Sequence, residues 1–377
     1  MRSRCSAWPT RRQCEGFTHN PGVSPTSLSR VLITGVSNPL GAEVARRLAP
    51  HVPFLFGCDV ADPISAPEEM DFVHADTRHA AIGKLVRQLR VDTVVHLAVM
   101  VDSPNAERSI HETDVIGTMN LLVGCSGPSS TVRRLIVKSS QAVYGAGPGD
   151  PSFFSEDMTS AERPAPSLTR DLLEMEQLVS EFALRNEACQ VSVLRLGFRV
   201  SEDTTLAHYL SLPIVPTYAG YDPRLQLLHE DDAVEAIVRA VLGEHPGVFN
   251  VAADGVVLLS QAVAIMGGRP APILLPYGHW LARLALRALT RVDVQAHLAA
   301  VIAFGSVADC SRFEREFGWK PAFTSRAVMD GLARGKTLEV IEAPSPPQEY
   351  ELQVYLQRRR REARNGHRDV PALKARP

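Results

Sequence analysis

Short apolar runs alternate with longer amphipathic stretches through the first half of the chain. The runs are rich in Val, Ile and Leu and end at Gly, Asp or Ser, which is typical of strands. We predict strands at residues 30–36, 54–59, 71–76, 91–99, 133–140 and 191–196. The stretches between them space apolar residues three or four apart, so we predict helices at 40–49, up to 89, 107–125 and 169–186. This alternation indicates an α/β fold with a doubly wound parallel sheet.

The second half of the chain has shorter apolar runs and a looser pattern. We predict short strands near 213–217, 224–228 and 247–252, with a helix at 231–242. Residues 30–200 are therefore expected to form the sheet domain. Residues 201–342 are expected to form a smaller C-terminal region that is interleaved with the first domain and packs over the ends of its sheet.

Composition narrows the class of protein. The chain has 377 residues, 45% of them apolar, and a formal net charge of −2, which gives no overall attraction to nucleic acid or anionic membranes. No apolar run approaches the roughly 20 residues that span a bilayer. The six cysteines are scattered without a CxxC pair. This favours free thiols in a reducing compartment, the cytoplasm, and no metal site.

Both ends of the chain are rich in Arg. Residues 1–29 lack the apolar stretch of a secretory signal, so we expect a disordered extension, with an organelle transit peptide or a misplaced start codon as alternatives. Residues 343–377 are expected to be a solvated basic tail, with binding of an anionic partner as the alternative. The stretch 280–291 is expected to be a covering helix, with a membrane surface or a partner as the alternative contact.

The turn after the first predicted strand reads TGVSNPLG, at residues 34–41. Dinucleotide-binding folds use glycines here for a tight turn, for close approach to a pyrophosphate and for packing of helix on strand. Gly35 and Gly41 hold the outer positions. Asn38 replaces the middle glycine, and we expect it to adopt the left-handed backbone that Asn tolerates. The helix start at Pro39 and Leu40 would face the phosphates. Plain strand–turn–helix packing is the alternative.

An acidic residue, Asp59, ends the second predicted strand. A carboxylate at this place accepts hydrogen bonds from the adenosine ribose and repels a 2′-phosphate, which favours NAD over NADP. An Asp in a surface turn is the alternative, because CDVADP is turn-like.

Further motifs follow in register. In chain order they are HADTRH, VVHLAV, DVIGTMNLL, VKSSQAVYG, LQLLHEDDAVEAIVRAV, GVFNVAA and DCSRFEREFGWKP. Together with the glycine turn, they resemble the motifs of the extended short-chain dehydrogenase/reductases, the NAD-dependent epimerase/dehydratase family. The resemblance runs from about residue 30 to 332.

The resemblance implies a Rossmann-type fold, NAD as the cofactor and a small-molecule substrate. Besides the glycine turn and Asp59, it assigns to the cofactor site Asp76, Thr77, Leu97, Ala98, Val99, Asp114 and Ser139. In this family the first of these holds the adenine. Ser140 is placed at the catalytic Ser/Thr, with a strand-end Ser bonded to backbone as the alternative. The resemblance also implies a homodimer through helices that flank the site.

The family's proton-transfer pair is missing. A Tyr and a Lys four residues later belong on the helix before EQLV, and counting back from Glu176 places them at Leu168 and Leu172. A Tyr and its tuning Lys carry the family's proton transfer, and such groups typically contribute about 10²–10⁴ in rate. Tyr144 as a substitute, or a shifted alignment, are alternatives, although no other Tyr-x-x-x-Lys occurs in the chain.

Other chemistry-bearing residues have ordinary interpretations. His96 is expected to be a satisfied core histidine. The run from His229 to Asp232 resembles a metal cluster but is expected to be a strand end and helix cap.

Two functions fit this reading of the sequence. The first is an atypical family member that binds NAD(H), with weak or altered chemistry on a nucleotide-sugar-like or polyol substrate. The second is a non-catalytic NAD-binding regulatory or scaffold subunit. Gly41→Val is expected to abolish cofactor binding while the fold is retained.

Overall fold

The computed structural model describes residues 28–335, except for Ile64, 101–109, Ser152, 159–166, 202–203 and 274–293. The extension at 1–29 lies almost wholly outside the described residues. The tail at 343–377, the helix expected at 280–291 and the start of the helix expected at 107–125 also lie outside them. No helix among the described residues is long and apolar enough to cross a membrane.

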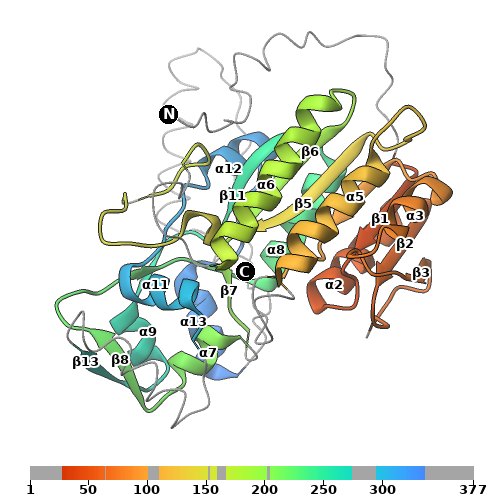
Figure 1. The fold of residues 1–377 in the computed structure, drawn as a ribbon. Coiled ribbons are helices and arrows are strands. Elements are labelled where there is room, and N and C mark those ends of the chain that lie inside the picture. Colours follow the sequence, from red (N-terminus) through yellow and green to blue (C-terminus); the bar gives the residue numbers. More distant parts are fainter. Residues whose placement is uncertain are drawn as a thin grey trace, which may run out of the picture. The chain divides into compact units, whose positions relative to one another are not determined.

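Seven parallel strands form the central sheet (Figure 1). They are β1 (Arg30–Thr34), β2 (Phe54–Asp59), β3 (Met70–His74), β4 (Thr93–His96), β5 (Arg134–Ser140), β6 (Gln190–Leu196) and β11 (Gly247–Val251). Their order across the sheet is β11-β6-β5-β4-β1-β2-β3. The six N-terminal strands lie where the apolar runs predict them, and the doubly wound α/β fold is confirmed.

Helices cover both faces of this sheet, as Figure 1 shows. One face packs against α2 (Pro39–Leu48) and α8 (Glu230–Leu242). The other face packs against α3 (Ala81–Leu89), α5 (Gly117–Cys125) and α6 (Ser167–Arg185). A π-helical turn, η2 (Glu112–Ile116), precedes α5, and a 3-10 turn, η3 (Gln141–Tyr144), follows β5. The two apolar layers account for the nearly all-buried strands β4 and β5.

The C-terminal stretch is divided between the sheet and small elements near it. We expected β11 and α8 in the smaller region, but β11 pairs in parallel with β6 and α8 packs on α2. The expected strand at 224–228 is two short strands, β9 (Arg224–Leu225) and β10 (Leu227–Leu228), which pair with different partners.

The smaller elements complete the described chain. The strands are β7 (Phe198–Arg199), β8 (Ile214–Tyr218), β12 (Val257–Leu258) and β13 (Arg269–Ile273). The helices are α7 (Thr205–Leu210), α9 (Leu259–Ile265), α11 (Ala296–Phe304), α12 (Ser311–Phe317) and α13 (Ser325–Arg334). A short 3-10 turn, η1 (Ala49–His51), follows α2.

Candidate functional site

The two outer glycines of the first turn are required by close backbone approaches. Gly35 has φ +81°, and a Cβ there would lie 2.7 Å from the Ala98 amide nitrogen. A Cβ on Gly41 would lie only 2.1 Å from the Gly35 carbonyl oxygen. No side chain fits at either place, so the β1–α2 turn has the tight geometry that a dinucleotide fold uses. Gly41→Val would therefore strain the fold itself, contrary to the expectation that the fold is retained.

Asn38 does not play the conformational role expected of it. Its backbone is extended, at φ −83° and ψ 153°, and the expectation of a left-handed residue was wrong. Instead Asn38 caps α2: its Oδ1 accepts from the Gly41 amide at 2.8 Å, and its Nδ2 donates to the Gly35 carbonyl. Pro39, at the first helical position, has no N–H to donate. The Gly41 amide is already bonded and Pro39 has none, so the start of α2 has fewer free amides for a phosphate than an ordinary helix start.

Asp59 lies at the carboxyl end of β2, as expected, and is half-buried. Its Oδ2 accepts from the Ser37 amide at 3.0 Å and from the Ser37 hydroxyl, and its Oδ1 accepts from the Val60 amide at 2.7 Å. These bonds join the acid to the glycine turn. They fix the carboxylate of Asp59 at the carboxyl end of β2, beside Ser37.

The remaining proposed cofactor residues line the same edge of the sheet. Asp76 accepts from the Arg78 amide and pairs with its guanidinium at 2.6 Å, which holds the pKa of Asp76 below its usual value. Thr77 is buried and lies so close to Gly117 that a Cβ there would approach its Oγ1 to 2.8 Å. The segment Leu97–Val99 crosses under the glycine turn, where the Leu97 amide donates to the Thr34 carbonyl at 3.1 Å.

Two serines end β5. Ser139 is buried and donates through Oγ to Glu176 Oε1 at 2.5 Å, so its hydroxyl faces α6. Ser140 caps η3 by accepting from the Ala142 amide at 3.2 Å. This is the interaction expected of a strand-end serine. Both serines also line a small cavity at the ends of β5 and β6, where ligands of open α/β sheets bind.

On α6, the two positions at which the sequence places the family's Tyr and Lys carry apolar side chains. Leu168 is 4% exposed and Leu172 0%, and both pack into the apolar layer with Val143, Met175 and Val179. The two side chains form the apolar face expected from their four-residue spacing. Leu168 and Leu172 are therefore part of the apolar core on this face of the sheet.

Tyr144 is not an exposed substitute acid. It is fully buried, its hydroxyl donates to Asn250 Oδ1 at 2.7 Å, and it accepts from Arg195 at 2.9 Å. Burial raises the pKa of Tyr144 to about 12. Arg195 also pairs with Glu176 at 2.7 Å, so this network joins α6 to β6 and β11. Its members are bonded to one another, which indicates a structural role.

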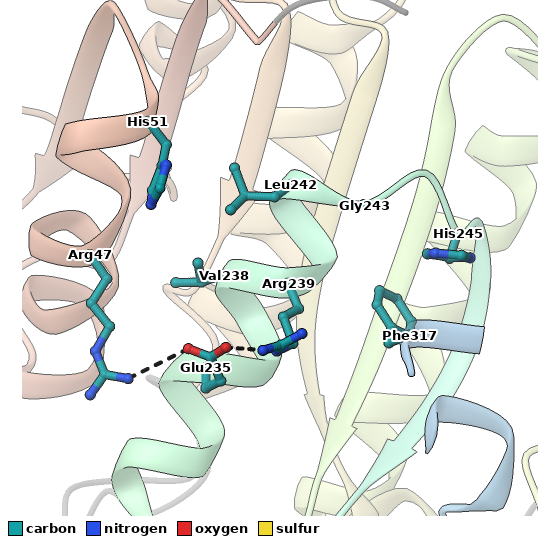
Figure 2. A pocket seen from close by; sticks show the side chains of 9 residues that line it. All are labelled: Arg47, His51, Glu235, Val238, Arg239, Leu242, Gly243, His245 and Phe317. Carbon is teal, nitrogen blue, oxygen red and sulfur yellow. Dashed lines mark hydrogen bonds and ion pairs between the residues drawn. The ribbon is translucent and has the colours of Figure 1, made fainter. Parts of the chain in front are cut away.

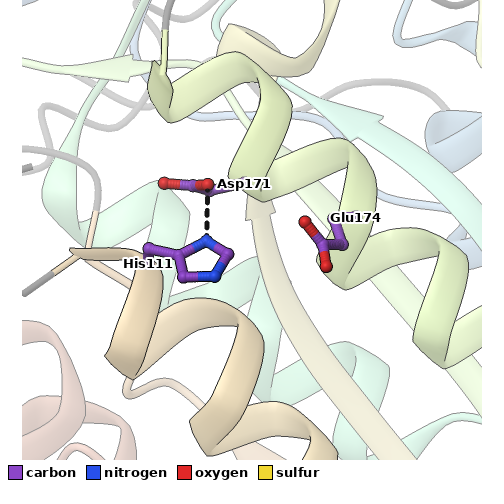
Figure 3. Close-up of side chains that lie close together, drawn as sticks. All are labelled: His111, Asp171 and Glu174. Carbon is purple, nitrogen blue, oxygen red and sulfur yellow. Dashed lines mark hydrogen bonds and ion pairs between the residues drawn. The ribbon is translucent and has the colours of Figure 1, made fainter. Parts of the chain in front are cut away.

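A cluster of ionisable groups that sequence reasoning missed lies where η2 meets α6 (Figure 3). His111 Nδ1 bonds Asp171 Oδ1 at 2.8 Å, and this bond raises the pKa of His111. Glu174 lies nearby, with the ligand atoms of the three residues within 4.8 Å of one another. His111 and Asp171 are 60 positions apart in the chain, so no local sequence pattern could predict this pair.

Asp114, on η2, is fully buried beside this cluster. Its Oδ1 accepts from the Met100 amide at 2.8 Å, while its Oδ2 has no hydrogen-bond partner among the described residues. Burial raises the pKa of Asp114 to about 7, against the opposing charge of Lys138. Asp114 is thus a buried carboxyl with one oxygen that accepts no hydrogen bond and a pKa near neutral pH, which is unusual for a purely structural residue.

Two ordinary interpretations are confirmed. His96 is buried between Thr34 Oγ1 at 2.8 Å and Thr118 Oγ1 at 2.9 Å, and burial lowers its pKa to about 3. His229 caps α8, and Asp232 accepts from the Ala322 and Phe323 amides.

A larger cavity lies away from these residues (Figure 2). It is lined mainly by the C-terminal parts of α2 and α8, at the edge of the sheet opposite to the carboxyl ends of the strands. Glu235 pairs with Arg239 at 2.6 Å and lies 3.8 Å from Arg47. Because its guanidinium groups already face a carboxylate, this cavity offers no clear binding chemistry.

The site residues fit a dinucleotide with one adjustment. No side chain covers the backbone of the turn at Gly35 and Gly41, so a ligand could approach it closely. Asp59 lies at the end of β2, bonded to the same turn. The side chain of Asn38 must turn away from the Gly41 amide for a phosphate to bond there. Such a rotamer change costs on the order of 1 kcal/mol, a small fraction of dinucleotide binding energy.

Comparison with known proteins agrees with this geometry. Residues 31–252 match the NAD dependent epimerase/dehydratase family. Uncharacterized protein Rv0501 of Mycobacterium tuberculosis (strain ATCC 25618 / H37Rv) is 36% identical over 325 residues, covering 83% of this chain and 86% of that protein.

Solved structures share the fold. MoeE5 in complex with UDP-glucuronic acid and NAD matches with TM-score 0.61 and 19% identity, over 81% of this chain and 99% of the other. A dTDP-glucose 4,6-dehydratase from Bacillus anthracis str. Ames in complex with NAD matches with TM-score 0.59 and 14% identity, over 81% and 96%. The sequence match spans more than half of the chain, and the chain therefore belongs to the NAD dependent epimerase/dehydratase family.

Proposed function

We propose that this protein binds NAD(H) and carries out oxidoreductase, epimerase or dehydratase chemistry on a nucleotide-sugar-like or polyol substrate, weakly or in altered form. NAD is the cofactor of its family. The structural neighbours include complexes with NAD and with UDP-glucuronic acid, which supports a nucleotide-sugar ligand. The cofactor would be held by the glycine turn, Asp59, Asp76 and the Leu97–Val99 backbone, and Ser140 would face the substrate.

The observation that carries the proposal is the contrast within one site. Gly35 and Gly41 keep a backbone cradle in which no Cβ fits. Leu168 and Leu172, in contrast, are buried in the core, where they neither transfer a proton nor bond a ribose. NAD supplies hydride chemistry when it is bound, and the chain lacks the usual partner for the proton.

Turnover assays with NAD and a panel of UDP- and dTDP-sugars test this proposal. The wild type should turn over slowly, and Leu168→Tyr combined with Leu172→Lys should raise the rate. Fast turnover by the wild type would show that another acid replaces the tyrosine fully. Arg170, exposed on the same helix, provides a control: Arg170→Lys should leave the rate unchanged.

The second candidate function is that of a non-catalytic, NAD-binding regulatory or scaffold subunit. The full burial of the two leucines favours it, since no described tyrosine side chain takes the place of the missing donor. Binding of NAD(H) without turnover of any sugar nucleotide, in the wild type and in the double variant, would support this function over the first. For either function we propose a cytoplasmic location and a homodimer through helices that flank the site.

A further inference from the structure

Three metal-ligating side chains meet where η2 packs against α6. Asp171 and Glu174 are three residues apart on α6, so they project from neighbouring turns on one side of the helix. His111, directly before η2, reaches them from the other element, and Figure 3 shows the imidazole and the two carboxylates side by side. Their ligand atoms all lie within 4.8 Å of one another. One imidazole nitrogen and two carboxylate oxygens therefore converge on one place.

The charges of this cluster are not balanced among its members. Asp171 bonds His111 at 2.8 Å, whereas Glu174 makes no hydrogen bond or ion pair with another of the described residues. The two carboxylates thus share at most one positive charge, that of the His111 imidazolium. Because like charges at this distance repel each other, a cation between the three side chains would relieve an unfavourable arrangement.

Asp114 provides a second observation, which does not depend on exposed groups. It is fully buried, its Oδ1 accepts from the Met100 amide, and its Oδ2 has no hydrogen-bond partner among the described residues. Asp114 lies on η2 about one helical turn after His111, and the charges of His111 and Asp171 act on it. Its second oxygen is therefore available to accept from a water molecule on a cation that the three ligands hold.

We propose that His111, Asp171 and Glu174 bind a zinc ion that joins η2 to α6. The imidazole nitrogen favours zinc over magnesium or calcium, which take oxygen ligands. Three protein ligands leave a fourth position for water, as in zinc sites that remain open to a ligand. On binding, zinc takes the place of the proton that His111 Nδ1 shares with Asp171, and this proton is released to solvent.

The site needs only a small closure to reach zinc geometry. Zinc–ligand bonds of about 2.0–2.2 Å place tetrahedral ligand atoms roughly 3.5 Å apart. Asp171 is buried and already bonded to His111, so these two ligands are held in place. Glu174 is exposed and can close the remaining distance by rotation of its side chain.

Titration calorimetry of the wild-type chain with zinc chloride and with magnesium chloride tests the proposal. Zinc should bind more tightly than magnesium. Loss of an outer-shell partner costs a metal site about 10- to 100-fold in affinity, so loss of a ligand in His111→Ala or Glu174→Gln should cost at least about 100-fold. Asp114→Asn should cost about 10-fold. Glu181→Gln, elsewhere on α6, is the matched control and should leave the affinity unchanged.

Thermal unfolding gives a second readout. Zinc should raise the Tm of the wild type, because it binds only where η2 and α6 are packed together, and should not raise the Tm of Glu174→Gln. Zinc on free cysteines or on other histidines persists in the variants. The proposed site is therefore counted as the one ion per chain by which the wild type exceeds His111→Ala.

The outcomes decide the proposal without reference to NAD. Equal zinc affinity in the wild type, His111→Ala and Glu174→Gln overturns it, whatever the total number of ions bound. Loss of binding in Glu174→Gln but not in His111→Ala shows adventitious binding to carboxylates and also overturns it, as does tighter binding of magnesium than of zinc. If His111→Ala fails to fold, His111→Gln takes its place and must show the same loss.

Discussion

The turn after β1 and the first turns of α6 differ in how strictly the structure fixes their residues. At the β1–α2 turn, a Cβ on Gly41 would lie 2.1 Å from a backbone oxygen, so the residue is fixed by the chain's own geometry. At the start of α6, Leu168 and Leu172 fill an apolar layer that any well-fitting side chain satisfies. A turn built on close backbone contacts accepts only glycine at such a position, whereas a position in an apolar layer accepts any apolar side chain that fits.

Asn38 is the exception within the turn, and it sharpens the comparison. It stands at the middle glycine position, where no close backbone approach forbids a side chain, and it bonds the helix amide that a phosphate would use. The turn therefore accepts only glycine where two backbone segments are in contact, and it accepts a side chain at Asn38, where no backbone lies as close.

The largest expected effect on stability is at Gly41. Gly41→Ala should lower the free energy of unfolding by at least about 3 kcal/mol and abolish NADH binding, because its Cβ would meet the Gly35 carbonyl. Urea unfolding checks the stability, with Gly149→Ala as the control, since a Cβ there meets nothing within 4 Å. Equal midpoints for the two variants would contradict the role of close packing in this turn.

The apolar face of α6 at Leu168 and Leu172 should be destabilised by a charged side chain. Leu172→Lys alone places an ammonium in the apolar layer and should cost about 3 kcal/mol of unfolding free energy. Leu184→Lys, on the same helix but 52% exposed, should change stability by less than about 0.5 kcal/mol. If both variants unfold at the same urea concentration, the position of Leu172 in the core is refuted.

Asp114 should make stability depend on pH. Its pKa rises from the ordinary 3.8 to about 7 on folding, so the native state holds more protons than the unfolded chain between these values. Stability then falls as pH rises through this window. Lys138, Asp171 and His111 are the charged groups that act on it.

Asp114→Asn keeps the acceptor for the Met100 amide and removes this titration. It should be more stable than the wild type by about 2 kcal/mol at pH 8, with a smaller difference at pH 5. Urea unfolding at both pH values measures the difference. A difference that is the same at pH 5 and pH 8 would rule out a titrating Asp114.

The smallest effect concerns the capping residue of the turn. Asn38→Gly frees the Gly41 amide, so NADH should bind about two- to fivefold more tightly, while stability falls by only a few tenths of a kcal/mol. Thr204→Gly removes a comparable cap from α7, away from the turn, and should leave the affinity unchanged. Unchanged affinity in the Asn38 variant would mean that its side chain does not compete with the cofactor.

Local patterns predicted the parts of the molecule that depend on local sequence. The strands up to β6, the cap at His229 and the buried Leu168–Leu172 face all follow from spacing within a few residues. Pairings over long distances in the chain did not. The pairing of β11 with β6 and the bond from His111 to Asp171 both join segments that are dozens of residues apart.

Lys138 escaped notice for a different reason. A single lysine before two serines has the pattern of a strand end that faces solvent, and its burial becomes visible only when β5 lies inside the sheet, between β4 and β6. The extended backbone of Asn38 likewise depends on the bond that its side chain makes to Gly41.

Titration calorimetry of the wild-type protein with NADH and NADPH tests the central claim most directly. The account predicts saturable binding of one NADH per chain and weaker binding of NADPH, because Asp59 repels a 2′-phosphate. Equal affinity for the two nucleotides would show that Asp59 does not contact the adenosine ribose. No binding of either would contradict the central claim, that this chain binds NAD(H) although it lacks the family's Tyr–Lys pair.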